Sequence, residues 1–508
     1  MTVTYSPPAP APAPKTPLQA LCGRLLETHN PIFVSNRGPI EFSMSSYGLS
    51  ASRGSGGVVT ALTAASNHFE DITWISLAMT NDDRIAAEAL GRSMRFHDLS
   101  NANLRLVVTP KSVFRRHYNV FCNPLLWFLQ HSMWDICRTP SVDSSVHEAW
   151  EKGYVAVNKS VARAVLEDAA LSDKPPLVML QDYHLYLAAA YIRERRPDAL
   201  IQHFTHIPWP SPQIWQILPP EMRTGIMTGM CANDIVGFQT ERDAKNFLYT
   251  CAELLPESQV DFDQNTVLFG DHVTFVRAYP ISVDIEHLKN MAQSTEVLDY
   301  EDKLRPLMGR HTIVRVDRLD PSKNVLRGFQ AFELMLRRHP ELLGKVKFLA
   351  FLVPSRNGIK EYRRYAKDIF KLIDGINQKF GVEGNKPIEV FYENNYAQAI
   401  AALKAYDVLL VNSVADGMNL VAKEGSVVNE RDGVLVLSET TGAFQQLGHN
   451  AIPVTPTDVE GTADALYSGL TMDSSERGAR ARALRACVEQ SEITDWISKQ
   501  LMDLTSVA

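Results

Sequence analysis

The sequence predicts an α/β protein with two doubly wound domains. Short β-branched runs alternate with longer helix-like stretches from Pro31 onward, and strands separated by crossover helices form mostly parallel sheets. The same alternation begins again after residue 310. We therefore expect two sheets whose strand C-termini face a central cleft, which is where such sheets bind their ligands.

The expected strands are short apolar runs. The first sheet is predicted to contain residues 32–35, 72–75, 104–108, 177–180, 201–204 and 235–238. The second is predicted to contain residues 312–316, 346–352, 388–392, 408–411 and 434–437. Runs rich in Val, Ile, Leu and Phe are typical of strands that are covered on both faces.

Composition predicts the domain boundaries. Residues 1–16 are rich in Pro and Ala and are expected to be a disordered tail, because they carry little apolar surface to bury. An N-terminal domain over 17–285 and a C-terminal domain over 286–475 follow, with a polar stretch near the junction. Residues 476–508 are predicted to form a helix that packs back across this junction.

Bulk properties exclude several classes of protein. The chain has 508 residues, is 45% hydrophobic and has a formal net charge of −7, so no global basic field attracts nucleic acid or an anionic membrane. Its six cysteines include no CxxC pair, which argues against a disulfide framework and a zinc site. No apolar stretch is long enough for a membrane span, and no secretion signal is apparent. We expect a cytoplasmic protein, and whether it forms a homo-oligomer is left open.

Two cations flank a turn after the first strand of the second sheet. Arg318 and Lys323 lie five residues apart around Pro321. Arg318 can make a bidentate contact with a diphosphate, while Lys323 adds a second point charge. The plain alternative is a surface turn with weak ion pairs.

A second motif favours diphosphate binding over a plain surface turn. Residues 416–424 follow the run at 408–411, and Gly417 permits an unusual backbone angle. The helix expected from Asn419 would direct free N–H groups toward a ligand, and Glu424 could accept hydrogen bonds from a ribose diol. The alternative is a helix capped by Asp416 or Asn419, with Glu424 solvated. Together, the two segments predict a site for a nucleotide-linked substrate.

Polar side chains also follow the strands of the N-terminal domain. Arg37 follows the first strand, and the glycine-rich residues 54–57 precede a helical stretch, which by itself is a weak sign of phosphate binding. Asp182 and His206 follow two later strands. A single histidine is usually structural, but here three polar side chains are expected at one sheet edge.

Eleven strings, in order along the chain, resemble the trehalose-6-phosphate synthases, which are retaining glycosyltransferases of the two-domain GT-B fold. The resemblance extends from about Pro31 to the C-terminal helix. The strings are SNRGPI, GSGGVVTAL, HYNVFCNPLLW, QDYHL, HIPWPSPQIWQILP, GFQTERDAKNFL, YPISVD, VDRLDPSKN, VPSR, DGMNLVAKE and VLSETTGA.

The resemblance implies that glucose moves from a nucleotide-diphosphate glucose to glucose 6-phosphate, giving α,α-trehalose 6-phosphate. It assigns the acceptor to the N-terminal domain and the nucleotide sugar to the C-terminal domain, with no metal and no cofactor. In this family no side chain acts as a nucleophile, and the leaving phosphate takes the acceptor proton.

The resemblance also implies individual roles. The residues implied on the donor are Arg318 and Lys323 for the diphosphate, Glu424 for the ribose, Leu420 and Val421 for backbone contacts to phosphate, Asp416, Met418, Asn419 and His206 for the transferring sugar, and Gly57. The residues implied on the acceptor are Arg37, Tyr118, Trp127 and Arg356, with Asp182 on a hydroxyl. Arg318, Lys323, Asp182 and His206 would be the catalytic residues.

Four departures from the family pattern keep the substrates open: Leu77, Asn324, Ala415 and Gly425 stand where a tryptophan, a glycine, an arginine and an aromatic residue are common. They also resemble the validamycin-type relatives, which couple a cyclitol donor to an aminocyclitol phosphate. A second alternative is an inactive sugar-phosphate sensor, although the donor-site residues are all present. UDP, GDP and ADP remain open as the donor nucleotide.

Overall fold

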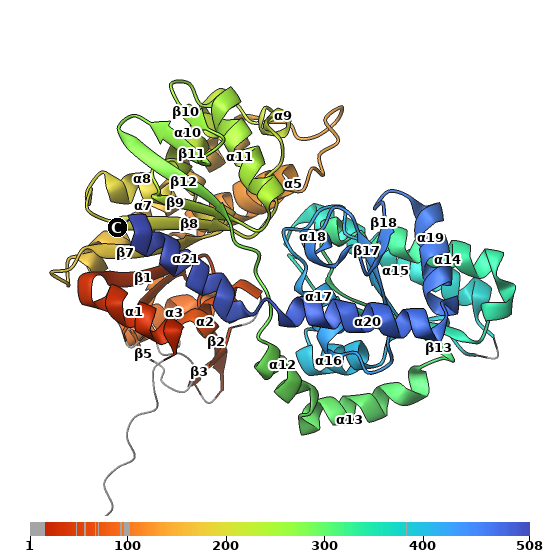
Figure 1. The fold of residues 1–508 in the computed structure, drawn as a ribbon. Helices are drawn as coiled ribbons and strands as arrows, with labels where there is room; N and C mark the ends of the chain where they lie inside the picture. Colours follow the sequence, from red (N-terminus) through yellow and green to blue (C-terminus); the bar gives the residue numbers. More distant parts are fainter. Residues whose placement is uncertain are drawn as a thin grey trace, which may run out of the picture.

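The computed structural model describes residues 16–46, 48–54, 57–66, 68–69, 71–91, 94–95, 102–356, 358–382 and 384–507 (Figure 1). The chain forms two α/β lobes, each built around its own sheet. Residues 1–15 of the predicted tail lie outside the described residues. No helix among the described residues is long and apolar enough to cross a membrane.

The first lobe contains a ten-stranded sheet in the order β10-β11-β12-β9-β8-β7-β1-β4-β6-β5. Its strands are β1 (Asn30–Ser35), β4 (Thr73–Leu77), β5 (Met94–Arg95), β6 (Asn103–Val107), β7 (Pro176–Gln181), β8 (Leu200–Thr205), β9 (Ile235–Phe238), β10 (Gln259–Asp261), β11 (Thr266–Phe269) and β12 (His272–Ala278). The central strands are parallel, whereas β5, β10 and β11 pair antiparallel with their neighbours. All six predicted strands are confirmed.

Helices cover both faces of this sheet, and a hairpin of β2 (Ile40–Ser45) and β3 (Gly48–Arg53) lies beside it. The helices are α1 (Pro17–Thr28), α2 (Gly57–Ser66), α3 (Asn81–Leu90), α4 (Lys111–Arg115), η1 (Arg116–Leu126), α5 (Trp127–Gln130), α6 (Ser144–Ala149), η2 (Trp150–Val155), α7 (Ala156–Ala169), η3 (Tyr183–Leu185), α8 (Ala188–Arg193), α9 (Pro212–Trp215), α10 (Pro220–Met230) and α11 (Glu241–Leu254).

The second lobe contains a fully parallel six-stranded sheet in the order β15-β14-β13-β16-β17-β18. Its strands are β13 (His311–Arg318), β14 (Val346–Val353), β15 (Ile388–Phe391), β16 (Val408–Val411), β17 (Val434–Ser438) and β18 (Ile452–Val454). The five predicted strands are confirmed, and β18 was not predicted. Both lobes therefore have the Rossmann-like organisation that the sequence predicts.

The helices of the second lobe lie on both faces of its sheet (Figure 1). They are α12 (Ile285–Ala292), α13 (Thr295–Leu304), η4 (Arg305–Leu307), η5 (Pro321–Lys323), α14 (Val325–Arg338), η6 (Pro340–Leu342), α15 (Lys360–Phe380), α16 (Tyr396–Lys404), α17 (Leu420–Val428), α18 (Phe444–Leu447), α19 (Val459–Thr471) and α20 (Ser474–Glu489).

The chain passes between the lobes twice. Residues 279–284 connect β12 to α12, and residues 490–492 connect α20 to the last helix, α21 (Ile493–Val507). The sequence predicted one continuous helix here, but two form, and α21 packs against α1 and α2 of the first lobe (Figure 1).

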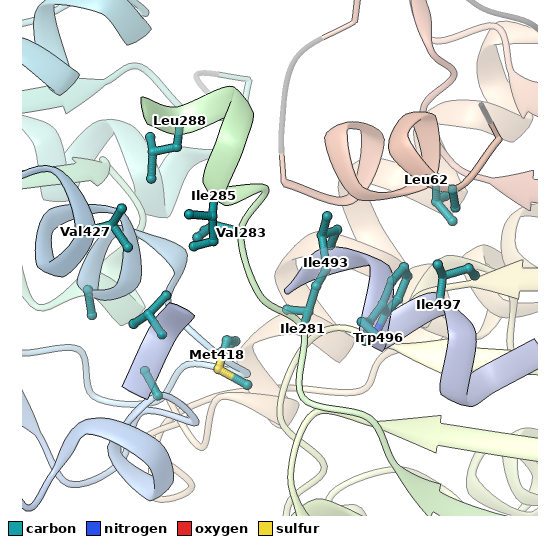
Figure 2. Packing of buried hydrophobic residues seen from close by; sticks show 14 of the residues in the cluster. Leu62, Ile281, Val283, Ile285, Leu288, Met418, Val427, Ile493, Trp496 and Ile497 are labelled. Atoms are coloured by element: carbon teal, nitrogen blue, oxygen red, sulfur yellow. The ribbon is translucent and has the colours of Figure 1, made fainter. Parts of the chain in front are cut away.

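Buried apolar side chains follow both connections. Figure 2 shows Ile281 beside Ile493 and Trp496, with Leu62 of α2 close to α21. Just after the first connection, Ile285 at the start of α12 is packed in the same buried cluster as residues of α17. This cluster is continuous from one lobe to the other, so burial of apolar surface stabilises their contact.

Candidate functional site

The two lobes touch where the loop after β16 meets the loop after β8. A Cβ atom at Gly417 would overlap the carbonyl oxygen of His206 and lie 3.2 Å from the Cα of Ile207. Gly417 does not have a positive φ, and glycine is needed here because the backbone of the first lobe approaches so closely. The residue with a positive φ is Asn419, at +83°.

His206 is held on three sides. Its backbone N–H donates to Asp182 Oδ1 at 3.2 Å. Its ring Nε2 lies 2.8 Å from Gln181 Oε1, and its Nδ1 lies 3.4 Å from Gln239 Nε2. Burial lowers the pKa of His206 to about 3, so the ring is neutral at neutral pH.

Asp182 follows β7 with a positive φ of 71°. Burial raises the pKa of its carboxyl to about 6, although the His206 N–H and the positive charges of Arg356 and Arg318 oppose this rise. Asp182 and His206 therefore lie together at one sheet edge, within electrostatic reach of the second lobe. Their separate roles in binding stay predictions.

Asp320 joins two arginines that the sequence analysis treated separately. It is fully buried, and its Oδ2 lies 2.6 Å from Arg318 Nη2. Its Oδ1 lies 3.2 Å from Arg356 Nη1 and accepts a 2.6 Å hydrogen bond from the Ser355 hydroxyl. Burial alone would raise the pKa of Asp320, but Arg318 and Arg356 lower it to about 2. The sequence reasoning gave Asp320 no role, although it lies between the two cations of the same turn.

Arg356 reaches from the second lobe to aromatic residues of the first. Its guanidinium lies 4.9 Å from the centre of the Trp127 ring, at cation–π distance. It donates to the Tyr362 hydroxyl at 2.7 Å and to the Tyr183 hydroxyl at 3.3 Å. Tyr362 lies on α15 of the same lobe as Arg356, whereas Tyr183 belongs to the first lobe. Neither tyrosine was predicted, because nothing in its local sequence indicates a contact with Arg356.

Lys323 and Asp416 form an ion pair at the base of α17. Asn419 Nδ2 also donates to Asp416 Oδ2 at 3.0 Å, and Asn419 Oδ1 accepts from the Ala422 N–H at 3.0 Å. Burial would raise the pKa of Asp416, but the positive charge of Lys323 brings it below its usual value. Asn419 is therefore the N-cap of α17, as the alternative of a capped helix predicted, and Leu420 is the first residue of this helix.

Arg315 is fully buried and contacts the turn that contains Lys323. Arg315 Nη2 donates to the Lys323 carbonyl at 3.0 Å and lies 2.8 Å from Asp317 Oδ2. This buried pair fixes the end of β13, and no sequence signal had identified it.

The other donor-side residues lie along α17 or next to it. Val421 is the second residue of the helix, and Met418 is packed in the core at 4% exposure. Glu424 accepts a hydrogen bond from the Tyr396 hydroxyl at 3.0 Å, and burial raises its pKa. Glu424 is thus partnered in this structure rather than freely solvated.

Three predicted residues lie at the rim of the first lobe. Arg37 pairs with Glu41 at 2.9 Å and is about half exposed. Tyr118 stacks on His184, with ring centroids 5.9 Å apart. Gly57 is the first residue of α2, but residues 55–56 of its loop lie outside the described residues.

Three of the four departures from the family pattern are locally accommodated. Asn324 has a φ of 57°, a conformation that favours glycine, and its Nδ2 donates to the carbonyls of Asn412 and Pro456 at 2.9 and 2.6 Å. A Cβ at Gly425 would lie 2.5 Å from Leu409 Cδ2, so this packing leaves no room for an aromatic side chain. Leu77 is buried in the core at the end of β4.

Ala415, the fourth departure, lies partly exposed beside Asp416. Among the described residues there is no cluster of three or more His, Cys, Asp or Glu side chains that could hold a metal ion.

Comparisons with known proteins identify the family of this chain. The model of glycosyltransferase family 20 matches residues 29–506. The α,α-trehalose-phosphate synthase (UDP-forming) A of Dictyostelium discoideum is 31% identical over 92% of this chain, which spans 61% of that protein. The validamine 7-phosphate valienyltransferase of Streptomyces hygroscopicus subsp. limoneus is 32% identical over 89% of this chain and 88% of its own length.

Solved structures agree as well. The α,α-trehalose-phosphate synthase (UDP-forming) from Burkholderia xenovorans in complex with glucose-6-phosphate has a TM-score of 0.80 and 26% identity, covering 94% of this chain and all of its own.

Proposed function

This chain belongs to glycosyltransferase family 20, and from that premise we propose that it transfers glucose from UDP-glucose to glucose 6-phosphate, with retention, giving α,α-trehalose 6-phosphate. Two similar proteins support this choice of donor and acceptor. Both are named as UDP-forming synthases, and one of them was solved in complex with glucose-6-phosphate. This chain spans only 61% of the Dictyostelium protein, so the activity of that whole protein is a proposal for this chain.

One observation carries the proposal. A single buried carboxylate, Asp320, contacts the guanidinium groups of Arg318 and Arg356, which both belong to the second lobe. Arg318 lies on the proposed donor side, whereas Arg356 contacts the ring of Trp127 in the first lobe. A reaction between two phosphorylated substrates needs positive charge on both sides of the reacting bond. Asp320 holds both arginines in fixed positions and leaves Arg318 half exposed for a ligand.

On the donor side, Arg318 and Lys323 would stabilise the charge that develops on the departing diphosphate. Such contacts accelerate the reaction because they are stronger in the transition state than in the bound substrate. Lys323 is paired with Asp416 in this structure. A diphosphate that binds Lys323 would compete for this pair and leave Asp416 free to accept hydrogen bonds from the glucosyl hydroxyls.

On the acceptor side, Arg356 and Arg37 would hold the phosphate, with Tyr118 and Trp127 beside the sugar. Asp182 would accept a hydrogen bond from an acceptor hydroxyl. The attacking hydroxyl would lose its proton to the leaving phosphate oxygen on the face from which that group departs, so its oxygen forms the new bond on the same face. No side-chain nucleophile is required.

A coupling reaction of the validamine type is the second candidate. It is favoured by the Streptomyces relative, which is as similar as the trehalose-phosphate synthase, and by Leu77 and Ala415. The acceptor phosphate would use the same arginines in both reactions, so the donor ring and the acceptor ring distinguish the two.

The decisive experiment measures nucleotide release from UDP-, GDP- and ADP-glucose, each with and without glucose 6-phosphate, with mass spectrometry of the product. A phosphorylated non-reducing disaccharide that forms only with glucose 6-phosphate supports the proposal and identifies the nucleotide. A parallel assay uses a nucleotide-linked cyclitol as donor and an aminocyclitol phosphate as acceptor, and release only in that assay supports the second candidate. Release with any phosphorylated acceptor rules out an inactive sensor, and no release in either assay contradicts both enzymatic proposals.

A further inference from the structure

One peptide group in the first connection between the lobes contacts both of them. The Ile281 N–H donates to Gln239 Oε1 at 3.0 Å, and Gln239 lies in the first lobe directly after β9. The Ile281 carbonyl accepts a 2.6 Å hydrogen bond from Lys423 Nζ, on α17 of the second lobe. Figure 2 shows Ile281 between the two lobes.

The contact with Ile281 determines which way the Gln239 amide points. A backbone N–H can only donate, so the Gln239 atom that faces it must be the oxygen. The amide nitrogen of Gln239 then faces His206 Nδ1, at 3.4 Å. Because an amide N–H₂ group only donates, Nδ1 must be the unprotonated acceptor.

The other side of the His206 ring follows from this. A neutral imidazole whose Nδ1 is unprotonated carries its proton on Nε2. His206 Nε2 lies 2.8 Å from Gln181 Oε1, which can accept that proton's hydrogen bond. Gln181 Nε2 is buried and has no hydrogen-bond partner among the described residues, so this amide contributes only its oxygen here.

Lys423 holds the other end of the same peptide group. Its side chain is buried, at 1% exposure, and the ion pairs among the described residues do not include it. A buried amino group without a carboxylate partner needs a hydrogen-bond acceptor, whether it is charged or neutral. The Ile281 carbonyl supplies one, so the connection is fixed at its N–H by Gln239 and at its C=O by Lys423.

We propose that Gln239 is a positioning residue that fixes His206 in the neutral Nε2–H tautomer and connects it, through the Ile281 peptide, to helix α17. The donor-binding residues proposed above open the same helix. The effect on turnover rests on the proposed function, whereas the tautomer of His206 does not.

The test reads the tautomer directly. We would label the histidines with ¹⁵N in the unliganded full-length protein and identify the His206 signals as those lost in a His206→Asn variant. Long-range ¹H–¹⁵N correlations show which ring nitrogen carries the proton. We expect protonated Nε2 and unprotonated Nδ1 near neutral pH. A protonated Nδ1 in the wild-type protein overturns the proposal, whether or not any variant folds.

Gln239→Glu provides the second arm. A carboxylate accepts from both the Ile281 N–H and His206, so Nδ1 should become protonated, either by a switch of tautomer or by formation of an imidazolium. Gln202→Glu is the matched control, since Gln202 is a buried glutamine on β8 that contacts Gln500 rather than His206. An unchanged His206 signal in a folded Gln239→Glu protein would contradict the proposal.

Kinetics then separate positioning from mere packing. We expect Gln239→Glu to lower kcat about 10- to 100-fold, the range for outer partners of functional histidines, with little change in acceptor KM. The Gln202→Glu variant should keep kcat. If the wild-type protein shows the expected tautomer but no turnover, the proposed function fails while this inference stands.

Discussion

Replacing Asp320 with asparagine tests the arrangement of the two arginines. The substitution keeps the size of the side chain and removes the charge that lies 2.6 Å from Arg318 and 3.2 Å from Arg356. Arg318 is half exposed and can regain water. Arg356 is mostly buried, so it would lose its carboxylate partner without gaining solvent.

The magnitude follows from the pKa of Asp320. Its shift from 3.8 to about 2 corresponds to roughly 2 to 3 kcal/mol, at about 1.4 kcal/mol per pH unit. Because the folded-state pKa is lowered, this stabilisation is present above about pH 4 and is lost as the pH falls through about 2. The unpaired Arg356 adds to the cost, and we expect a total loss of about 2 to 5 kcal/mol in unfolding free energy near pH 7.

Asp407→Asn is the matched control. Asp407 is also buried between two arginines, Arg431 at 3.1 Å and Arg477 at 3.6 Å, but it precedes β16 at the opposite edge of the same sheet. Urea unfolding and steady-state kinetics would be measured for both variants. We expect comparable destabilisation, with kcat reduced about 100-fold only in Asp320→Asn, because a displacement of about 1 Å at a reacting group can have this effect. Equal kinetics in the two variants would refute the role assigned to Asp320.

Four further predictions can be checked by kinetics or unfolding. Arg318→Ala should lower kcat about 10²- to 10³-fold through lost stabilisation of the leaving group, with acceptor KM nearly constant; an unchanged kcat would exclude its role. Arg356→Ala should raise KM for phosphorylated acceptors selectively, and an equal loss with unphosphorylated acceptors would contradict this. The pKa of about 6 at Asp182 predicts that kcat/KM falls below about pH 6, as the carboxylate is protonated, and that Asp182→Asn abolishes this step. Burial lowers the pKa of Lys423 from 10.5 to about 7. Between these two pH values the unfolded chain binds more protons than the folded protein, so the free energy of unfolding should rise with pH over that interval. The Lys423→Met variant should lack this rise in urea titrations.

The fold was largely predictable because most of its strands are buried on both faces. Continuous apolar runs such as 348–352 predict a buried strand clearly, whereas β10 and β11 are short, mixed in composition and pair at the sheet edge. The motif strings also placed Arg318, Lys323 and Asp182 in loops that follow predicted strands.

The partners of these residues were less predictable. Asp320, Tyr183 and Gln239 all lie within the strings that resemble the family, yet they contact residues from distant parts of the sequence. The glycine at 417 was expected for its backbone angle, but its cause is a carbonyl oxygen from a residue more than two hundred positions earlier. Periodicity and local turn chemistry carry no information about such distant neighbours.

The double passage of the chain between the lobes restricts how they can move. Two rigid bodies joined at two separate points can rotate only about the line through those points. Sliding and twisting would require stretching residues 279–284 or 490–492. His206 is linked to Ile281 by a single glutamine, so it lies near this axis and should move little. Any opening would therefore widen the site progressively with distance from His206.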